Sequence, residues 1–320
     1  MIDISVFGAG AFGTALAISL ADDGRNVTLI ARDAGHANMM SAARSNTARL
    51  PGHSFPPTLM PVSDPTKITD ICLIAVPTQK LAAFMARNTA SFANKILVAC
   101  CKGVDLTSGK GPTDIISTAC PSATAAILSG PSFATDIAAG LPTALTLAVQ
   151  DPVIGKSLQK ILSTSNLRLY QSSDVKGVEL GGALKNVIAI AAGVTIGAGL
   201  GESARAALMT RGYAEMKKFS VGSGALPETL SGLSGFGDLV LTCTSEKSRN
   251  FSFGQRLGQG DTTSSNVTVE GVATAKAVSN MANTLNIDMP VTDAVSALLD
   301  QKITVAQAVE MLLSRPLKKE

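Results

Sequence analysis

The stretch "SVFGAGAFGTALAISLADDG" constrains the fold more than any other part of the chain. It places Gly8, Gly10 and Gly13 in a GxGxxG pattern, directly after an apolar run at residues 3–8 and at the start of a helical window. The first glycine permits a tight turn, the second lets a pyrophosphate approach the backbone, and the third lets helix and strand pack. The phosphates then rest on the helix N-terminus. A glycine-rich turn used only for packing is the alternative, but the flanking strand and helix favour a dinucleotide site.

Short apolar runs continue through the first half of the chain and alternate with helical windows. After the first run they lie at residues 26–31, 70–76, 95–101, 124–128 and 143–149, and a further one lies at 167–171. Such runs are typical of strands in a parallel sheet that is buried on both faces. We therefore expect residues 1–172 to form a Rossmann-like, doubly wound α/β domain that binds the dinucleotide.

The pattern changes after residue 172, where strand signals cease. Long helical windows follow at residues 174–198, 202–219, 270–285, 291–301 and 304–314. A chain of 320 residues is also longer than one core usually supports. We expect residues 173–320 to form an all-α substrate and catalytic domain.

Composition and charge exclude several classes of function. Hydrophobic residues make up 46% of the chain and charged residues 16%, as in a compact enzyme. The net charge of +3 is scattered, apart from the terminal "RPLKKE", which argues against a nucleic-acid partner. The N-terminus shows no secretory leader, so we expect a cytoplasmic protein. The uncharged stretch at residues 186–201 is short for a bilayer, which needs about 20 residues, and is interpreted as a core helix rather than a membrane span.

Cysteine and histidine usage argues against metal and hydrolase chemistry. The five cysteines form no CxxC pair and have mostly apolar neighbours, so we expect reduced core thiols. Only two histidines, His36 and His53, are present, and we expect both to lie far from the motif-bearing segments. No metal site and no Ser/His or Cys/His pair is expected.

The segment "LIARD" bears on cofactor choice. NAD-specific proteins place an acidic residue at the end of the second strand, about 20 residues beyond the glycine motif, to bind the ribose 2′-hydroxyl. This chain has Arg32 there, and a guanidinium binds a 2′-phosphate in bidentate fashion. We expect NADPH to be accepted as well as NADH. The alternative is that Asp33 binds the ribose instead.

Two loops follow neighbouring strands at the edge where α/β sheets hold ligands. "CCKG" places Lys102 beyond one strand, and "LSGPSFA" places Gly130, Ser132 and Ala134 beyond the next. Either loop alone is commonly only a surface loop. Together they predict a site.

A glycine-rich segment, "GLSGFGDLVLTCTSEKSRNFSFG", carries Asp238 and the cluster Ser248, Arg249 and Asn250. The carboxylate suits hydroxyl groups, and the guanidinium suits a phosphate. A glycine-rich connection with a solvated arginine is an equally good interpretation of the spacing.

Lys185 lies inside "ELGGALKNVIAIAAGVTIGAGLG", which is apolar on almost every face and therefore predicts a buried helix. A buried ammonium is costly unless it is paired or takes part in chemistry. Burial disfavours its charged form, which would bring the lysine towards exchanging a proton with a substrate oxygen. The alternative is a lysine that snorkels to solvent from the start of the helix.

Taken together, "GALKNVIAIAAG", "ILSGPSFA", "CCKG", "GFGDLVLTCTS" and "SRNFSFG" behind GxGxxG resemble the bacterial-type NAD(P)-dependent glycerol-3-phosphate dehydrogenases over almost the whole chain. The resemblance implies interconversion of dihydroxyacetone phosphate and sn-glycerol 3-phosphate with NADPH/NADP or NADH/NAD, in supply of phospholipid synthesis, by a homodimer. It implies that Lys185, next to Asn186, is the general acid/base. The substrate residues that it implies are Lys102, Gly130, Ser132, Lys185, Asp238, Ser248, Arg249 and Asn250.

The cofactor contacts that the resemblance implies, beyond the glycines of the motif, are Ala11, Phe12, Arg32, Lys102, Ala134, Arg249 and Glu270. The chain departs from the family at Ser203, where the family usually has Asn, and no role is assigned there. Two rival functions remain open at this point. One is a β-hydroxy-acid dehydrogenase of the same architecture, which leaves the "SRN" cluster unexplained. The other is a non-catalytic NAD(P)H sensor, which has no need of Lys185 and Asp238 together.

Overall fold

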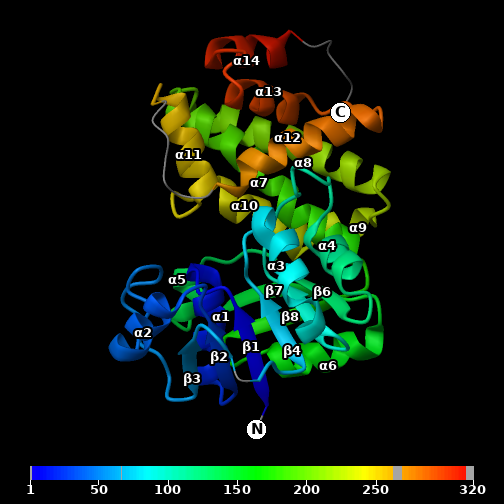
Figure 1. Cartoon of the computed structure of the whole chain (residues 1–320). Helices are drawn as coiled ribbons and strands as arrows, with labels where there is room; N and C mark the ends of the chain where they lie inside the picture. The colour runs from blue at the N-terminus through cyan, green and yellow to red at the C-terminus, as the bar shows by residue number, and fades with distance from the viewer. Residues whose placement is uncertain (1, 66, 262–268, 315–320) are drawn as a thin grey trace. The chain divides into compact units, whose positions relative to one another are not determined.

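The computed structural model describes residues 2–65, 67–261 and 269–314 (Figure 1). The chain divides into two compact units. The first runs to Lys102 and resumes with Gly111–Glu179, and the second consists of Gly103–Lys110 and the chain from Leu180 onward. The division between them falls inside one long helix, α7 (Val175–Gly197), whereas we expected a boundary at residues 172 and 173.

The first unit is built on one eight-stranded sheet with the strand order β3-β2-β1-β4-β5-β6-β7-β8 (Figure 1). The strands are β1 (Asp3–Phe7), β2 (Asn26–Ile30), β3 (Leu59–Val62), β4 (Ile71–Ile74), β5 (Ile96–Ala99), β6 (Thr124–Ser129), β7 (Thr143–Ala148) and β8 (Leu167–Ser172). Neighbours pair in parallel except β6 and β7, which are antiparallel. The fold class is confirmed, but the expectation that 143–149 continues a parallel sheet is wrong.

The central strands are buried on both faces, as their continuous apolar runs predict. In β4, Leu73 joins one core cluster, and its neighbours Cys72 and Ile74 join another on the opposite face. Successive side chains of a strand point to opposite faces, so each strand supplies both cores. The helices α1 (Ala11–Asp22), α2 (Ala34–Ala43), α5 (Ala134–Ala138) and α6 (Pro152–Leu162) contribute to the first core, and α3 (Thr78–Phe92) and α4 (Pro112–Ala119) to the second.

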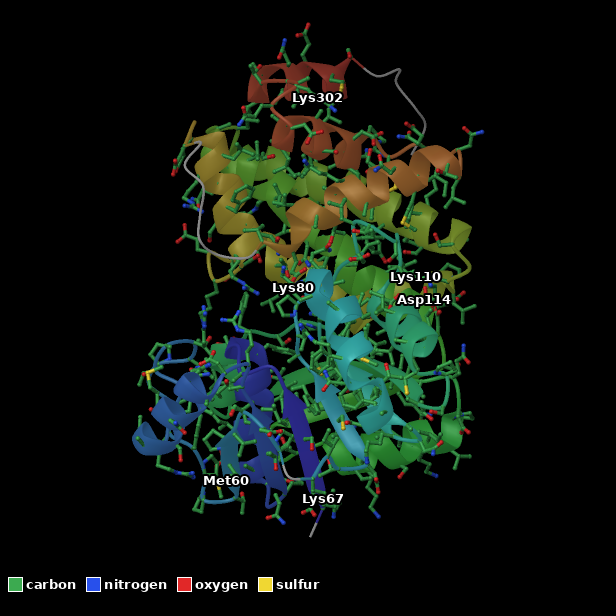
Figure 2. The ribbon with its side chains drawn as sticks, viewed as in Figure 1. Met60, Lys67, Lys80, Lys110, Asp114 and Lys302 are labelled. Atoms are coloured by element: carbon green, nitrogen blue, oxygen red, sulfur yellow. The ribbon has the colours of Figure 1, made fainter. Side chains whose placement is uncertain are left out.

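Strand β3 was missed by the sequence pattern, for a physical reason. Its four residues include Pro61, and it forms the edge of the sheet, where a proline does not interrupt a ladder on both sides. Met60, labelled in Figure 2, is 57% exposed. A short edge strand with an outward methionine lacks the apolar run by which buried strands are recognised.

Because β1 to β6 run parallel, their carboxyl ends lie at one edge of the sheet. The chain passes from β1 through β2 to β3 and then returns to β4 on the other side of β1. Such a reversal of strand order leaves a crevice where α/β sheets bind ligands.

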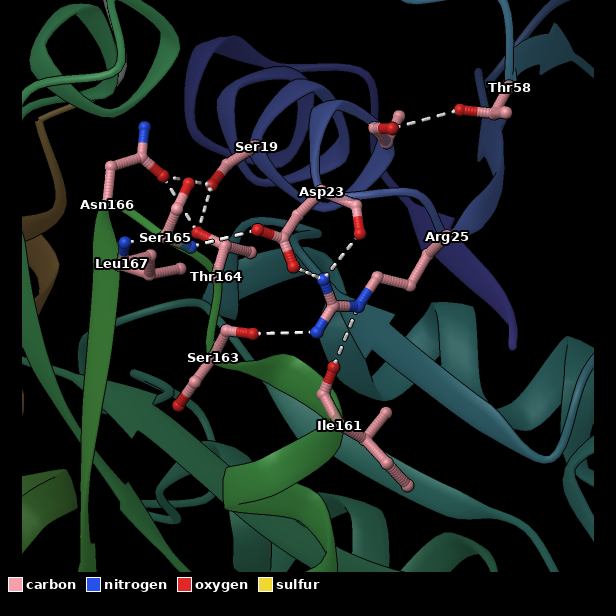
Figure 3. Close-up of polar contacts among 11 residues, drawn as sticks. Ser19, Asp23, Arg25, Thr58, Ile161, Ser163, Thr164, Ser165, Asn166 and Leu167 are labelled. Atoms are coloured by element: carbon pink, nitrogen blue, oxygen red, sulfur yellow. Dashed lines mark hydrogen bonds and ion pairs between the residues drawn. The ribbon is translucent and has the colours of Figure 1, made fainter. Parts of the chain in front are cut away.

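The end of α1 that is distant from the glycine motif is anchored by Arg25 (Figure 3). Arg25 Nε donates to the carbonyl of Ile161 at 3.1 Å, and its Nη2 donates to that of Ser163 at 2.7 Å. Asp23 forms an ion pair with Arg25 and accepts from the Ser165 amide at 2.9 Å. The turn after α1 is thereby fastened to the connection between α6 and β8.

All the regular secondary structure described in the second unit is helical. Besides α7 it contains α8 (Gly201–Gly222), α9 (Pro227–Leu230), one π-helical turn η1 (Leu233–Gly237), α10 (Asp238–Cys243), α11 (Arg249–Gly258), α12 (Glu270–Thr284), α13 (Pro290–Leu299) and α14 (Val305–Leu313). Helix α7 is long and apolar enough to cross a membrane, but 89% of its most apolar window is buried in the structure. The prediction of a core helix is confirmed.

Glycines bring α7 and α11 unusually close together. A Cβ on Gly193 would overlap the carbonyl of Phe251, and one on Gly254 would overlap the carbonyl of Ile190. Two side-chain-free positions therefore face each other across the helix pair. The glycines of "IAAGVTIG" serve this packing, and they hold the first turn of α11 beside the middle of α7.

Candidate functional site

The glycine motif of the first unit has the geometry that pyrophosphate binding requires. Gly8 has a φ of +108°, and a Cβ on it would lie 2.6 Å from the carbonyl oxygen of Ala75, which follows β4. A Cβ on Gly13 would overlap the carbonyl of Gly8. A Cβ on Gly10, in contrast, would meet nothing within 4 Å. Gly8 and Gly13 are thus needed for packing, whereas Gly10 leaves open space beside the backbone for a phosphate.

Helix α1 begins at this open position. Gly10 is its N-cap and provides no side-chain bond to the first turn. The first N–H groups of any helix lack intrahelical acceptors, and the helix dipole favours an anion there. Ala11 and Phe12, the first two residues of α1, therefore fit the pyrophosphate contacts expected of them.

At the end of β2, Arg32 and Asp33 take different positions. The Arg32 side chain is 97% exposed, with only a 4.0 Å ion pair to Asp33. The Asp33 Oδ1 caps α2 by accepting from the His36 amide at 2.9 Å. The carboxylate is thus engaged in a helix cap, which favours Arg32 over Asp33 as the group that contacts the ribose end of a dinucleotide.

The loops after β5 and β6 come together, as predicted. Lys102 Nζ donates to the carbonyl of Gly130 at 3.0 Å, and Ser132 Oγ donates to the same oxygen at 3.3 Å. Gly130 has a φ of +143°, which a residue with a side chain rarely adopts. Ala134 begins α5 directly after this loop.

In the second unit, Lys185 is buried and paired. Its Nζ donates to Asp238 Oδ1 at 2.8 Å and to Thr242 Oγ1 at 2.6 Å. Lys185 is 7% exposed and Asp238 only 1%. The alternative of a lysine that snorkels to solvent is therefore wrong. The carboxylate instead stabilises the ammonium form of this lysine inside the helical unit.

Thr242 was missed by the sequence reasoning. Its hydroxyl lies 3.2 Å from Asp238 Oδ1 as well as within bonding distance of Lys185. Asp238 and Thr242 are four residues apart on α10, and residues at this spacing share one helix face. The signal was present in "DLVLT", but it required knowing that this segment is a helix rather than a glycine-rich connection.

A second polar group joins three helices beside Lys185. Asn250 Nδ2 donates to Asn186 Oδ1 at 3.0 Å, and Asn250 Oδ1 accepts from the Gly271 amide at 3.0 Å. Asn186 follows Lys185 on α7, and Gly271 follows Glu270 at the start of α12. The buried Asn250 therefore links the neighbours of two predicted site residues.

The N-terminal end of α11 carries Ser248, Arg249 and Asn250, the residues predicted to contact a phosphate. Ser248 is the N-cap and accepts from the Phe251 amide at 3.2 Å. Arg249 is exposed at the first helical position. A helix N-terminus with an adjacent guanidinium is a suitable environment for a phosphate. Ser203, where the family usually has Asn, is an exposed residue of α8.

The cysteines are all buried and free, as expected. Burial raises the pKa of Cys243, which follows Thr242, to about 12, and that of Cys72 likewise to about 12. Both remain neutral thiols rather than nucleophiles at physiological pH. Within the described residues no group of His, Cys, Asp and Glu side chains is placed to hold a metal ion.

Comparison with known proteins decides the family. The sequence model described as the NAD-dependent glycerol-3-phosphate dehydrogenase N-terminus matches residues 3–154, and the model of the corresponding C-terminus matches residues 174–310. The chain belongs to the NAD-dependent glycerol-3-phosphate dehydrogenase family. The resemblance read from the motifs is confirmed.

Individual relatives in this family match the chain from end to end. A glycerol-3-phosphate dehydrogenase (NAD(P)+) of Ruegeria sp. (strain TM1040) is 54% identical over 321 residues, which cover 100% of both chains. The enzyme of the same name from Cereibacter sphaeroides is 55% identical over 99% of this chain and 100% of its own. The crystal structure of glycerol-3-phosphate dehydrogenase from Coxiella burnetii superposes with a TM-score of 0.93 at 37% identity, covering 98% of this chain and 99% of that one.

Proposed function

We propose that this chain is an sn-glycerol-3-phosphate dehydrogenase that reversibly reduces dihydroxyacetone phosphate with NADPH or NADH. The observation that carries the proposal is the buried Lys185, bonded to Asp238 at 2.8 Å and to Thr242 at 2.6 Å in a member of this family. A lysine held in this way between a carboxylate and a hydroxyl is positioned for proton transfer.

The cofactor fits the first unit because Gly10 leaves room for a pyrophosphate at the start of α1. When bound, the nicotinamide supplies the hydride that reduces C2 of the substrate. The residues that we assign to hold the cofactor are Gly8, Gly10, Ala11, Phe12, Gly13, Arg32, Lys102, Ala134, Arg249 and Glu270. The exposed Arg32 guanidinium supports acceptance of a ribose 2′-phosphate, and hence of NADPH.

Lys185 is the proton donor in the direction of reduction. Its ammonium gives a proton to the oxygen of C2 as the hydride arrives at the carbon, so that the ketone becomes an alcohol. The neutral amine then recovers a proton from solvent. In oxidation the amine accepts the hydroxyl proton. Asp238 and Thr242 hold Nζ in place and keep the ammonium charged between turnovers.

The substrate phosphate is assigned to Ser248, Arg249 and Asn250 in the first turn of α11. The remaining substrate contacts that we assign are Lys102, Gly130, Ser132 and Asp238. Charge-assisted hydrogen bonds from a guanidinium and a helix N-terminus suit a phosphate dianion.

The test is oxidation of NADPH, followed at 340 nm, with dihydroxyacetone phosphate and with unphosphorylated dihydroxyacetone. We expect rapid turnover with the first substrate and far less with the second, because the lost phosphate removes the bonds to Arg249 and its neighbours. Equal rates would contradict the phosphate site. Turnover of a β-hydroxy acid instead would favour the rival dehydrogenase. Binding of NADPH without turnover of either substrate would favour the non-catalytic sensor. Repeating the titration with NADH gives the cofactor preference.

We further propose that the protein is a cytoplasmic homodimer whose product supplies phospholipid synthesis. Five buried, free cysteines fit a reducing compartment. Exposed apolar side chains in the helical unit, among them Leu226, Phe236 and Val240, are suited to burial against a second copy. Light scattering during size-exclusion chromatography tests the dimer, and a mass equal to one chain would contradict it.

A further inference from the structure

Asn46, in the connection that follows α2, is a buried residue whose side-chain amide forms hydrogen bonds through both its nitrogen and its oxygen. It is 1% exposed. Its Nδ2 donates to the carbonyl of Ala9 at 3.0 Å and to Thr14 Oγ1 at 2.8 Å. Its Oδ1 lies 3.1 Å from Nε2 of His36. Because the Ala9 carbonyl can only accept, the orientation of the amide is determined, and His36 Nε2 is the donor to Asn46 Oδ1.

The three partners belong to two parts of the cofactor site. Ala9 lies between Gly8 and Gly10, and Thr14 lies in α1, so two bonds from Asn46 fasten the pyrophosphate loop to the helix behind it. His36 lies in the first turn of α2, where its amide is capped by Asp33 beside Arg32. Contrary to our expectation, this histidine is therefore linked to the glycine motif through Asn46.

A glycine loop held by a buried amide has a lower entropic cost of binding. Ordering a loop backbone when a ligand binds costs conformational entropy. Bonds that hold a loop in its bound conformation before the ligand arrives reduce this cost and raise affinity.

We propose that Asn46 is a positioning residue for the cofactor, which couples the pyrophosphate loop at Ala9 to the 2′-phosphate end of the site at Arg32 through His36. The proposal rests on the proposed cofactor site. Asn46 acts through Ala9, Thr14 and His36, and it takes no part in hydride or proton transfer.

The test uses two cofactor fragments without nicotinamide, ADP and 2′,5′-ADP, titrated by calorimetry. Asn46→Ala is expected to raise the Kd of both fragments and the KM for NADPH about 10-fold, as expected for loss of one or two buried hydrogen bonds. Its kcat at saturating NADPH is expected to stay within about 2-fold of wild type, because only binding is affected. His36→Ala is expected to raise the Kd of 2′,5′-ADP while leaving that of ADP within about 2-fold.

Asn88→Ala is the matched control. Asn88 donates to the Phe84 carbonyl at 2.7 Å within α3, and its removal is expected to leave both Kd values unchanged. If Asn46→Ala does not fold, the pair Thr14→Val and His36→Ala removes one bond each and carries the same test. Wild-type Kd values for both fragments in Asn46→Ala, or in Thr14→Val, together with a wild-type Kd for 2′,5′-ADP in His36→Ala, would overturn the proposal. Failure of the wild-type protein to bind either fragment would instead contradict the cofactor site itself.

Discussion

Gly271→Ala should damage the site through packing alone, because Gly271 lies against the polar group around Asn250. A Cβ added there would lie 2.7 Å from Asn250 Oδ1 and 2.8 Å from the carbonyl oxygen of Asn186. Ordinary contact begins at 3.4 Å, so the first turn of α12 or the Asn250 side chain must move by 0.7 Å, the difference between 3.4 and 2.7 Å. The Gly271–Asn250 hydrogen bond, 3.0 Å long, then stretches beyond a bonding distance.

The expected loss of stability follows from three contributions. Overpacking costs about 1–3 kcal/mol, and a lost hydrogen bond about 0.5–1.5 kcal/mol. Alanine in a helix regains about 1 kcal/mol relative to glycine. We expect the free energy of unfolding to fall by about 0.5–3.5 kcal/mol. We also expect kcat/KM for dihydroxyacetone phosphate to fall about 10-fold or more, because Asn250 is a proposed substrate contact and small misplacements are costly.

The assay combines urea unfolding with steady-state kinetics. Gly222→Ala, at the end of α8, is the matched control, because a Cβ there approaches only the flexible end of Ile287, at 2.7 Å. It should be as active as wild type. If Gly271→Ala is as stable and as active as this control, Asn250 is not positioned by Gly271 in the way described.

Three further predictions concern single side chains. Lys185→Met should lower kcat for NADPH oxidation by about 10²–10⁴-fold. Because this change removes the ion-pair partner of the buried Asp238, the double variant Lys185→Met/Asp238→Asn serves as the folding control. A Lys185→Met variant that retains a third of wild-type activity would show that the lysine is structural. Arg32→Asp should shift the ratio of NADPH to NADH affinity towards NADH in a paired titration, because a carboxylate repels the 2′-phosphate, and an unchanged ratio would point to Asp33. Burial raises the pKa of Glu215 from 4.5 to about 7, against bonds from Val291 and Thr292 that lower it, so the folded state retains a proton that the unfolded state loses. The stabilisation from protonated Glu215 is present in full below pH 4.5 and is lost as the pH rises to about 7. In urea unfolding, the free energy of unfolding should therefore fall by about 3 kcal/mol over this range relative to that of Glu215→Gln. If the difference in unfolding free energy between the two proteins does not change with pH, the hydrogen bonds keep Glu215 ionised.

The sequence by itself determined the features that local patterns encode. Buried strands such as β4 are apolar at every position, and the glycine motif lies between a strand and a helix, so the sheet and the pyrophosphate loop were predictable. The apolar circumference of α7 predicted a core helix, and Lys185 stood out because a charge in such a helix needs a partner. The closeness of Lys102 to Gly130 followed from the rule that parallel strands end at one edge.

Only the tertiary structure decided which distant residues meet. The antiparallel pairing of β7 leaves no mark on its own sequence, because a buried strand is apolar in either direction. Thr242 and Asn46 are ordinary polar residues in their own segments. They become important only where Lys185 or Ala9 reaches them, across 57 and 37 positions of sequence. Local composition determines the elements, whereas the partner of a buried polar group is determined by which elements pack together, because that group must find its hydrogen bond wherever the fold leaves it.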